Sequence, residues 1–154
     1  MLNSNGTVVD GSRVTSAVLS HNATLSLGGT RLPIVCTDED SMSEVVERGV
    51  ETCTRYIFDR AADGTDAIYC SWDTDSMDHS CMPGTSCPES FGIKAREAIQ
   101  IARIAGEYDV QVLELAELSP VFDASQISIK LACNLIYHFL GSRAAYLRGR
   151  GDSP

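Results

Sequence analysis

Apolar residues recur at helical spacing over the first clearly patterned segment of the chain, from Met42 to about Arg60. Steps of three and four residues place them on one side of a helix, with charged residues on the other side. Acidic residues fill the first turn, as helix starts prefer, and Asp63-Gly64 ends the element. Gly49 weakens this helix and is the position at which it would divide in two. The apolar stripe consists of Val45, Val46, Val50, Cys53, Ile57 and Phe58.

The pattern changes after this helix to an alternation of strands and helices. A short, nearly continuous apolar run over Ala67–Trp72 predicts a strand buried on both faces of a parallel sheet. Ile93–Tyr108 predicts an amphipathic helix that ends at Gly106, Asp109–Leu118 predicts a second strand, and Ser125–Ala145 predicts a long helix. The order strand, helix, strand, helix predicts an α/β domain with a mainly parallel sheet.

The two ends of the chain carry weaker patterns. Residues 1–40 are rich in Ser, Thr, Asn and Gly, with short apolar runs at Arg13–Leu19 and Arg31–Cys36 that suit strands. We therefore predict a poorly defined N-terminal segment over residues 1–40, an α/β domain over residues 41–145 and a flexible tail over residues 146–154. The tail contains the tripeptide Arg-Gly-Asp, which integrins recognise on extracellular proteins, so an adhesive function is one alternative.

Composition and charge narrow the class of protein. A net charge of −9 disfavours binding to a phosphate backbone, so we expect no nucleic-acid partner. No apolar run reaches the roughly 20 residues of a membrane helix, and the first residues lack the features of a signal peptide. These features predict a cytoplasmic protein with no membrane partner. The six cysteines form no CxxC pair and are read as reduced thiols, with Cys53, Cys70 and Cys133 acting as small hydrophobic residues.

Candidate chemistry begins where the first predicted strand ends. Asp73 and Asp75 flank Thr74, and residues two apart in an extended chain point to the same side, so both carboxylates can converge on one ion. Ligands of α/β sheets gather beyond the carboxyl ends of the strands. Carboxylate oxygens suit magnesium or manganese, and a pair of such ions can generate hydroxide near neutral pH. A solvated acidic turn is the alternative reading of this pattern.

The run from Ser71 to Glu89 reads SWDTDSMDHSCMPGTSCPE and resembles the ureohydrolase signature S-x-D-x-D-x-x-D-P-x-x-x-P-G-T-G-T-P of arginases, agmatinases, guanidino-acid hydrolases and formimidoylglutamases. The later run LELAELSPVFD resembles the segment D-x-x-E-x-x-P-x-x-D of the same family. The resemblance covers about Met42 to Leu140 and implies a three-layer α/β/α architecture, a partial arginase-like fold that corresponds to the C-terminal half. The matching signature residues are Ser71, Asp73, Asp75, Asp78, Pro83, Gly84, Thr85 and Pro88.

The resemblance also implies roles for individual residues. Asp73 and Asp75 would be ligands of a binuclear Mn²⁺ site, with Asp75 also carried over as the catalytic residue. Glu117 would bind the guanidinium or formimino group of a small guanidino or amidino substrate, while Asp78 would brace the loop. Hydroxide held by the metals would attack the C=N carbon and release urea or a related amide. The implied function is a manganese-dependent hydrolase of linear guanidino or amidino C–N bonds.

Several departures from the family pattern bear on that function. His79 stands where the family has Pro, and Ser86-Cys87 replaces Gly-Thr. The family motifs GGxH and D-A-H-x-D, which supply the other metal ligands, do not occur, and His21 and His138 are isolated. We therefore predict a truncated chain that is incomplete as an enzyme and is completed by a missing N-terminal half, or that forms a homo-oligomer. The alternative is a non-catalytic remnant or interaction module that keeps the scaffold.

Overall fold

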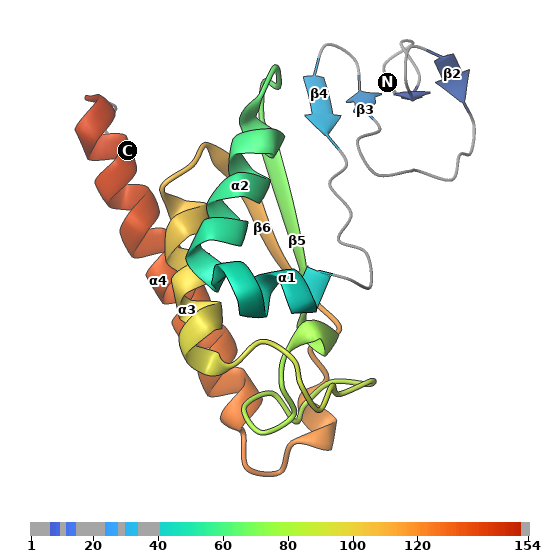
Figure 1. Cartoon of the computed structure of the whole chain (residues 1–154), viewed down its shortest axis with the longest axis vertical. Coiled ribbons are helices and arrows are strands. Elements are labelled where there is room, and N and C mark those ends of the chain that lie inside the picture. Colours follow the sequence, from blue (N-terminus) through green and yellow to red (C-terminus); the bar gives the residue numbers. More distant parts are fainter. Residues whose placement is uncertain (1–6, 10–11, 15–23, 28–29, 34–40, 152–154) are drawn as a thin grey trace.

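The computed structural model describes residues 7–9, 12–14, 24–27, 30–33 and 41–151. Its central part is an α/β unit in which helices pack beside a pair of strands (Figure 1). Helix α3 packs against α4, and α2 packs against α3. The elements of this unit are α1 (Ser41–Arg48), α2 (Val50–Ala62), β5 (Ile68–Asp73), α3 (Ala95–Gly106), β6 (Val110–Ala116) and α4 (Ile127–Arg150), with short 3₁₀ turns at Thr74–Ser76 and Pro120–Phe122.

Strands β5 and β6 are parallel, as the alternation of strands and helices predicts. Their register begins with Ile68 opposite Val110, shifts at Tyr69, and ends with Asp73 opposite Ala116. Both strands therefore finish at the same edge, so that Asp75 and Glu117 follow from neighbouring strand ends.

The N-terminal strands form a separate antiparallel sheet in the order β2-β1-β3-β4. Two of them overlap the apolar runs predicted as strands, namely β2 with Arg13–Leu19 and β4 with Arg31–Cys36. The rest of those runs, residues 15–19 and 34–36, lies outside the described residues. The strands are β1 (Thr7–Val9), β2 (Ser12–Val14), β3 (Thr24–Leu27) and β4 (Thr30–Pro33).

Two glycines set the limits of α2, as predicted. Gly49 separates α1 from α2 and has a φ of 82°, a left-handed conformation that glycine adopts without steric cost. At the other end the Asp63 N–H still bonds to the Asp59 carbonyl, and Gly64 follows with a φ of 67°. The predicted division of the long apolar stripe at Gly49 is confirmed.

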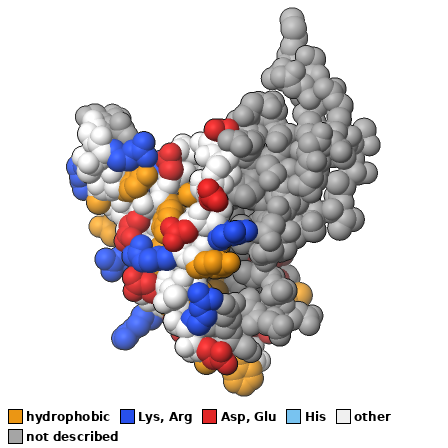
Figure 2. All heavy atoms as spheres, turned by 45° about the horizontal axis from the view of Figure 1, so that its top comes forward, with side chains coloured by type: hydrophobic (Ala, Val, Ile, Leu, Met, Phe, Trp, Pro, Cys, Tyr) orange, Lys and Arg blue, Asp and Glu red, His pale blue; other side chains and the backbone are white. Residues whose placement is uncertain are grey.

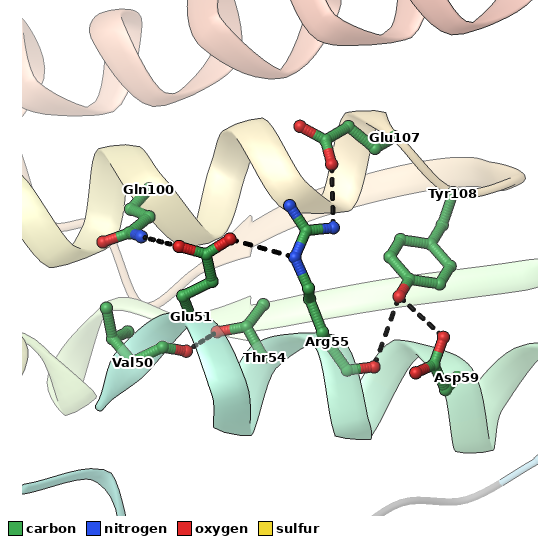
Figure 3. Close-up of polar contacts among 8 residues, drawn as sticks. All are labelled: Val50, Glu51, Thr54, Arg55, Asp59, Gln100, Glu107 and Tyr108. Atoms are coloured by element: carbon green, nitrogen blue, oxygen red, sulfur yellow. Dashed lines mark hydrogen bonds and ion pairs between the residues drawn. The ribbon is translucent and has the colours of Figure 1, made fainter. Parts of the chain in front are cut away.

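Polar contacts join α2 to α3 (Figure 3). The Arg55 guanidinium donates to Glu51 at 3.1 Å and to Glu107 at 2.9 Å, and the Tyr108 hydroxyl donates to Asp59 at 2.7 Å (Figure 3). The Tyr108 ring also stacks on Phe58 with ring centroids 5.3 Å apart. The ion pairs are exposed, so the apolar contact carries more of the stability. Acidic and basic side chains are interspersed on the face shown in Figure 2.

The buried face of α3 is built from small residues, as its alanine pattern predicts. Ala98, Ala102 and Ala105 are almost fully buried, which lets α4 approach closely. Gly106 was predicted to end the helix, and it is the last helical residue, but its conformation is ordinary. A Cβ at Gly106 would lie 2.5 Å from the Phe139 carbonyl oxygen of α4. Glycine is needed there for close helix packing rather than for a left-handed cap.

Three expectations about the edges of this unit are wrong. Helix α4 runs to Arg150 and is capped by Gly151 at a φ of 78°, so the first part of the predicted flexible tail is helical. Strand β5 is not buried on both faces, because Tyr69 is 51% exposed. Cys133 is exposed rather than packed.

All cysteines in the described part of the chain are free thiols, as predicted. None of the described helices is both long and apolar enough to cross a membrane.

Candidate functional site

The carboxyl end of β5 turns sharply at Asp73. The Asp73 side chain caps the 3₁₀ turn by accepting the Asp75 N–H at 2.9 Å, while its carbonyl accepts the Ser76 hydroxyl at 2.6 Å. The backbone is therefore not extended between the two aspartates, and the geometric reason given for their convergence is wrong. An Asp at the end of a strand can accept a hydrogen bond from the backbone N–H two residues later. This bond stabilises a turn in place of an extended backbone.

Thr74 anchors this turn to the neighbouring strand. Its side chain is fully buried, and its hydroxyl donates to the Ala116 carbonyl at 2.8 Å. Because Ala116 is the last residue of β6, this bond fixes the Asp75 turn relative to Glu117. Thr74 thus positions the two aspartates, although the sequence motif assigns no role to this residue.

Asp75, Ser86 and Glu117 form a hydrogen-bonded cluster at the shared edge. The Ser86 hydroxyl lies 3.3 Å from Asp75 Oδ2 and 3.3 Å from Glu117 Oε2, so its single proton can be donated to either carboxylate. The Cys87 N–H donates to Asp75 Oδ1 at 3.3 Å. Asp75 is half-buried and Glu117 is exposed. The two predicted site residues therefore lie on either side of Ser86, a position at which the chain departs from the family signature.

Glu117 has a left-handed backbone conformation with a φ of 59°. Such a conformation is unfavourable for a residue with a Cβ and is often found at functional sites. The chain leaves β6 at this residue, and two residues later the Ser119 N–H donates to the Gly84 carbonyl at 2.7 Å. Glu117 is thus a turn residue that faces the Ser86 loop rather than a strand residue at the edge of the sheet.

A buried carboxylate holds the first half of the motif loop. Asp78 is 3% exposed, pairs with the Lys94 ammonium group, and accepts the Ser80 N–H at 2.9 Å. Its own backbone carbonyl accepts the Cys81 and Met82 N–H groups, each at 3.0 Å. The Lys94 ammonium group, followed by the Ser80 bonds, lowers the pKa of Asp78 to about 2. The contacts agree with the expectation that Asp78 braces the loop.

A second buried carboxylate holds the other half. Asp123 accepts the Ser125 hydroxyl, the Ser125 N–H at 3.0 Å and the Ser128 N–H at 2.7 Å. The Ser128 hydroxyl in turn accepts the Gly84 N–H at 2.7 Å, and a Cβ at Gly84 would lie 2.9 Å from that oxygen. The Pro83-Gly84 turn is therefore fixed against the start of α4, and this positions Ser86.

Acid should destabilise the loops through these two carboxylates. The bonds to Ser125 and Ser128 lower the pKa of Asp123 to about 2, as Lys94 does for Asp78, from the ordinary value of 3.8 for an aspartate. A carboxyl with a depressed folded-state pKa stabilises the fold above its unfolded-state pKa and loses that contribution as the pH falls through the folded value. We expect the free energy of unfolding to fall between about pH 4 and pH 2.

Urea unfolding followed at a series of pH values would measure this dependence. Asp78→Asn and Asp123→Asn should each be less stable at neutral pH and should show a shallower fall below pH 4. A fall of unchanged steepness in both variants would mean that other groups cause the acid sensitivity.

The strain at Glu117 predicts a difference between two substitutions. Glu117→Gly should be more stable than Glu117→Ala by about 1 kcal/mol, because only glycine adopts a φ of 59° without steric cost. Gln126 has the same φ outside the cluster and provides a matched site for the same pair of substitutions. Thermal unfolding measures both differences. Equal stability of the Gly and Ala variants at Glu117, with a difference at Gln126, would contradict the assigned backbone strain.

The described residues supply only part of a metal site. Among them, no three His, Cys, Asp or Glu side chains come together as a group that could hold a metal ion. Asp73 and Asp75 offer the hard oxygen ligands that Mn²⁺ prefers, but one oxygen of Asp73 already accepts the Asp75 N–H. His79 is exposed, and its backbone N–H donates to the Glu89 carbonyl. The carboxylate oxygens are ligands of the kind that Mn²⁺ prefers, but the described residues supply too few of them for a complete site.

Comparison with known proteins agrees with the resemblance of the motif. The family model described as the arginase family matches residues 40–141. The human mitochondrial guanidino acid hydrolase is 36% identical over 77 residues, which are 50% of this chain and 22% of that protein. The agmatinase of Neisseria meningitidis serogroup C is 26% identical over 142 residues, 92% of this chain and 41% of that protein.

Comparison with solved structures also finds an arginase-family protein. A crystal structure of Trypanosoma cruzi formiminoglutamase with Mn²⁺ has a TM-score of 0.61 and 31% sequence identity. The match covers 66% of this chain and 33% of that protein. The chain thus spans between about a fifth and two-fifths of the length of the curated relatives that it matches.

Proposed function

This chain belongs to the arginase family, and on that premise we propose that it forms part of a hydrolase of linear C–N bonds in guanidino or amidino compounds. Membership was predicted from the Ser71–Glu89 motif, and the family match confirms it. The expected α/β class with a partial arginase-like fold is confirmed as well. Relatives named agmatinase and guanidino acid hydrolase support hydrolysis as the general activity.

The observation that carries this proposal is the cluster of Asp75, Ser86 and Glu117 at the carboxyl ends of β5 and β6. Within it, the Glu117 carboxylate would accept hydrogen bonds from the cationic guanidinium or amidinium group of a substrate. The Ser86 hydroxyl lies between Glu117 and Asp75 and would donate its proton to one of the two carboxylates. Because these side chains lie on turns anchored by Thr74 and by two buried aspartates, the cluster is oriented before a substrate arrives.

Manganese is part of the proposal. Asp73 and Asp75 would each offer a carboxylate ligand, and the remaining ligands would come from outside the described residues. When bound, Mn²⁺ would supply Lewis-acid activation of a water near neutral pH. The Mn²⁺ present in the T. cruzi formiminoglutamase structure supports this choice of ion.

We propose that the working protein includes a further part of the family fold, which carries the other metal ligands. The chain alone, or a homo-oligomer of it, would leave the proposed metals with few ligands. A small guanidino or amidino compound would be the substrate, with no nucleic-acid or membrane partner. A cytoplasmic location also stays a proposal, and the human relative is named mitochondrial.

Product release tests the hydrolase proposal. The purified chain would be incubated with Mn²⁺ and with agmatine, arginine, guanidinobutyrate or formiminoglutamate. The incubations would be repeated after co-expression with the portion of N. meningitidis agmatinase that lies outside its match to this chain. We expect release of urea or the corresponding amide in the co-expressed sample for one of these compounds. Absence of turnover with every compound in both samples would refute the proposal.

The incomplete ligand set favours one second function, a non-catalytic module that keeps the scaffold. That function predicts Mn²⁺ binding no tighter than for the Asp73→Asn variant. It also predicts that Glu117→Gln has no effect on any interaction of the protein. Titration of Mn²⁺ into the co-expressed sample, with wild type and with Asp73→Asn, separates the two functions, and product release by the Glu117→Gln sample provides a second test.

A further inference from the structure

A groove follows the contact between α3 and α4, which lie side by side (Figure 1). Its volume is about 350 Å³, within the roughly 300–1,000 Å³ that small-molecule sites occupy. Residues four apart on α4 share one face of the helix, and α3 adds one long side chain opposite them. We call this the α3–α4 groove; its lining residues are Arg103 of α3 and Tyr137, His138, Gly141, Ser142 and Ala145 of α4.

Small residues shape the α3–α4 groove. At Gly106, one turn after Arg103, the two helices approach so closely that a Cβ would lie 2.7 Å from the Ser142 Cβ. Gly141 differs, because no atom of the described residues lies within 4 Å of the position that its Cβ would occupy. Glycine weakens a helix relative to alanine, and packing gives no reason for it here. Its effect is to leave the α4 backbone bare where the groove runs.

The α3–α4 groove is free of acidic side chains in a chain that is acidic overall. The chain has 21 Asp and Glu residues against 12 Lys and Arg, yet α4 has no Asp or Glu. The Asp109 carboxylate, just after α3, is already paired with Arg143 at 2.6 Å. Within the part of the chain that the structure describes, no carboxylate pairs with Arg103, whereas Arg55 and Arg143 each have such a partner. The Arg103 guanidinium is therefore available to an anionic ligand.

The polar groups of the groove are of the kind that bind a phosphate. A guanidinium donates to oxyanions in a bidentate manner, and the His138 ring and the Tyr137 and Ser142 hydroxyls each have an N–H or O–H to donate. A phosphate monoester presents three terminal oxygens to such donors, and a carboxylate presents two. The number of donors therefore favours a phosphate monoester.

An aromatic side chain lies beside these donors. Tyr137 is 74% exposed, and its ring is perpendicular to the His138 ring, with centroids 5.9 Å apart. Exposed aromatic rings stack on flat organic groups and favour them without reading their detailed structure. The groove thus offers a surface for a ring next to the donors for a phosphate.

We propose that the α3–α4 groove binds a small phosphate monoester that carries a flat ring. The phosphate is held by Arg103, His138 and Ser142, and the ring lies against Tyr137. Because Arg103 is near the end of α3, the groove lies towards the start of β6, whereas Asp75 and Glu117 follow the ends of the strands. The inference uses neither of these carboxylates nor a metal, so it stands or falls independently of the proposed function.

Titration of phenyl phosphate into the purified chain at constant pH tests the site. The chain has three histidines, so nuclear magnetic resonance can follow each ring, and the signal lost in His138→Gln identifies the ring in the groove. We expect the His138 signals to shift in a saturable manner. Benzoate, with the same ring and a carboxylate, and inorganic phosphate, with no ring, should each bind at least roughly fivefold more weakly.

Three substitutions locate the binding. Arg103→Gln should weaken phenyl phosphate binding by at least about tenfold, since it removes the charged donor. Arg96→Gln is the matched control, with the same change at an exposed position two turns earlier on α3, and should bind like wild type. Gly141→Ala should weaken binding because its methyl group occupies the groove, while the fold becomes more stable. Loss of folding cannot produce that combination.

Each other outcome overturns the proposal. Absence of a saturable shift at His138 would mean that the groove is not a phosphate site. Equal affinity for benzoate would make the ligand a carboxylate, and equal affinity for inorganic phosphate would make it the free ion. Equal weakening by Arg96→Gln and Arg103→Gln would reduce the binding to general attraction by positive charge. Circular dichroism should be unchanged in both arginine variants, since both side chains are exposed.

Discussion

Replacing Gly106 with Ala is expected to lower the free energy of unfolding by about 2 kcal/mol. A Cβ at this position would lie 2.5 Å from the Phe139 carbonyl oxygen and 2.8 Å from the Arg143 backbone nitrogen. Because both atoms belong to the α4 backbone, the clash is relieved only if the two helices move apart, which opens the core around Leu135. Urea unfolding of the isolated chain, followed by far-ultraviolet circular dichroism, measures the change.

Gly141→Ala is the matched control for this prediction. Gly141 lies in α4 with nothing within 4 Å of the position that a Cβ would occupy. Alanine is the better helix former, so this variant should gain roughly 0.5–1 kcal/mol. If Gly106→Ala were also stabilising, the close packing of α3 on α4 described above would be incorrect.

Asp75→Asn is expected to lower kcat/KM of the assembled hydrolase on the order of 10³-fold. Losing a negatively charged metal ligand removes several kcal/mol of transition-state stabilisation, and each 1.36 kcal/mol corresponds to a factor of ten. The substitution keeps the shape of the side chain, so the Cys87 N–H and the Ser86 hydroxyl can still bond to it. Steady-state kinetics with the best substrate of the panel, together with the Mn²⁺ content of the purified protein, measure the effect.

Glu89→Gln is the control for charge in the same loop. Glu89 is exposed, and its backbone carbonyl accepts the His79 N–H. The control should retain full activity. An Asp75→Asn variant with activity close to wild type would show that Asp75 is neither a metal ligand nor a catalytic residue.

The fold was largely predictable because each element has a local signal. The Gly49 break, the Asp63-Gly64 end of α2 and the alanine face of α3 all follow from backbone freedom and side-chain size. The end of α4 was not predictable in the same way, since the last turns are rich in Arg and Gly. Those residues remain helical because Gly151 caps them, a signal that lies beyond the last apolar residue.

The site was predictable in its residues and less so in its geometry. Asp73, Asp75 and Glu117 could be taken from the motif, but the motif does not reveal that Asp73 caps a 3₁₀ turn or that Glu117 is left-handed. Ser86 was visible only as a replaced glycine, whereas its hydroxyl lies within 3.3 Å of both carboxylates. Ser86 is 11 positions from Asp75 and 31 positions from Glu117 in the sequence. Contacts over such separations depend on how both loops are fixed in the fold, which a local sequence pattern does not reveal.

Exposure was the least predictable property. The continuous apolar run of β5 indicated a strand buried on both faces, yet Tyr69 is half-exposed, and Cys133 is exposed on α4. An apolar pattern reports the type and spacing of the side chains, and it does not reveal which of them the fold covers.

A Mn²⁺ titration of the co-expressed complex tests the central claim most directly, because the claim is that the β5 and β6 edge is one part of a manganese site. Electron paramagnetic resonance of free Mn²⁺ would give the affinity for wild type and for the Asp73→Asn and Asp75→Asn variants. We predict that each variant weakens binding by at least roughly tenfold, as loss of a ligand requires, while Glu89→Gln does not. Mn²⁺ binding that is the same in wild type and in both aspartate variants would contradict the claim.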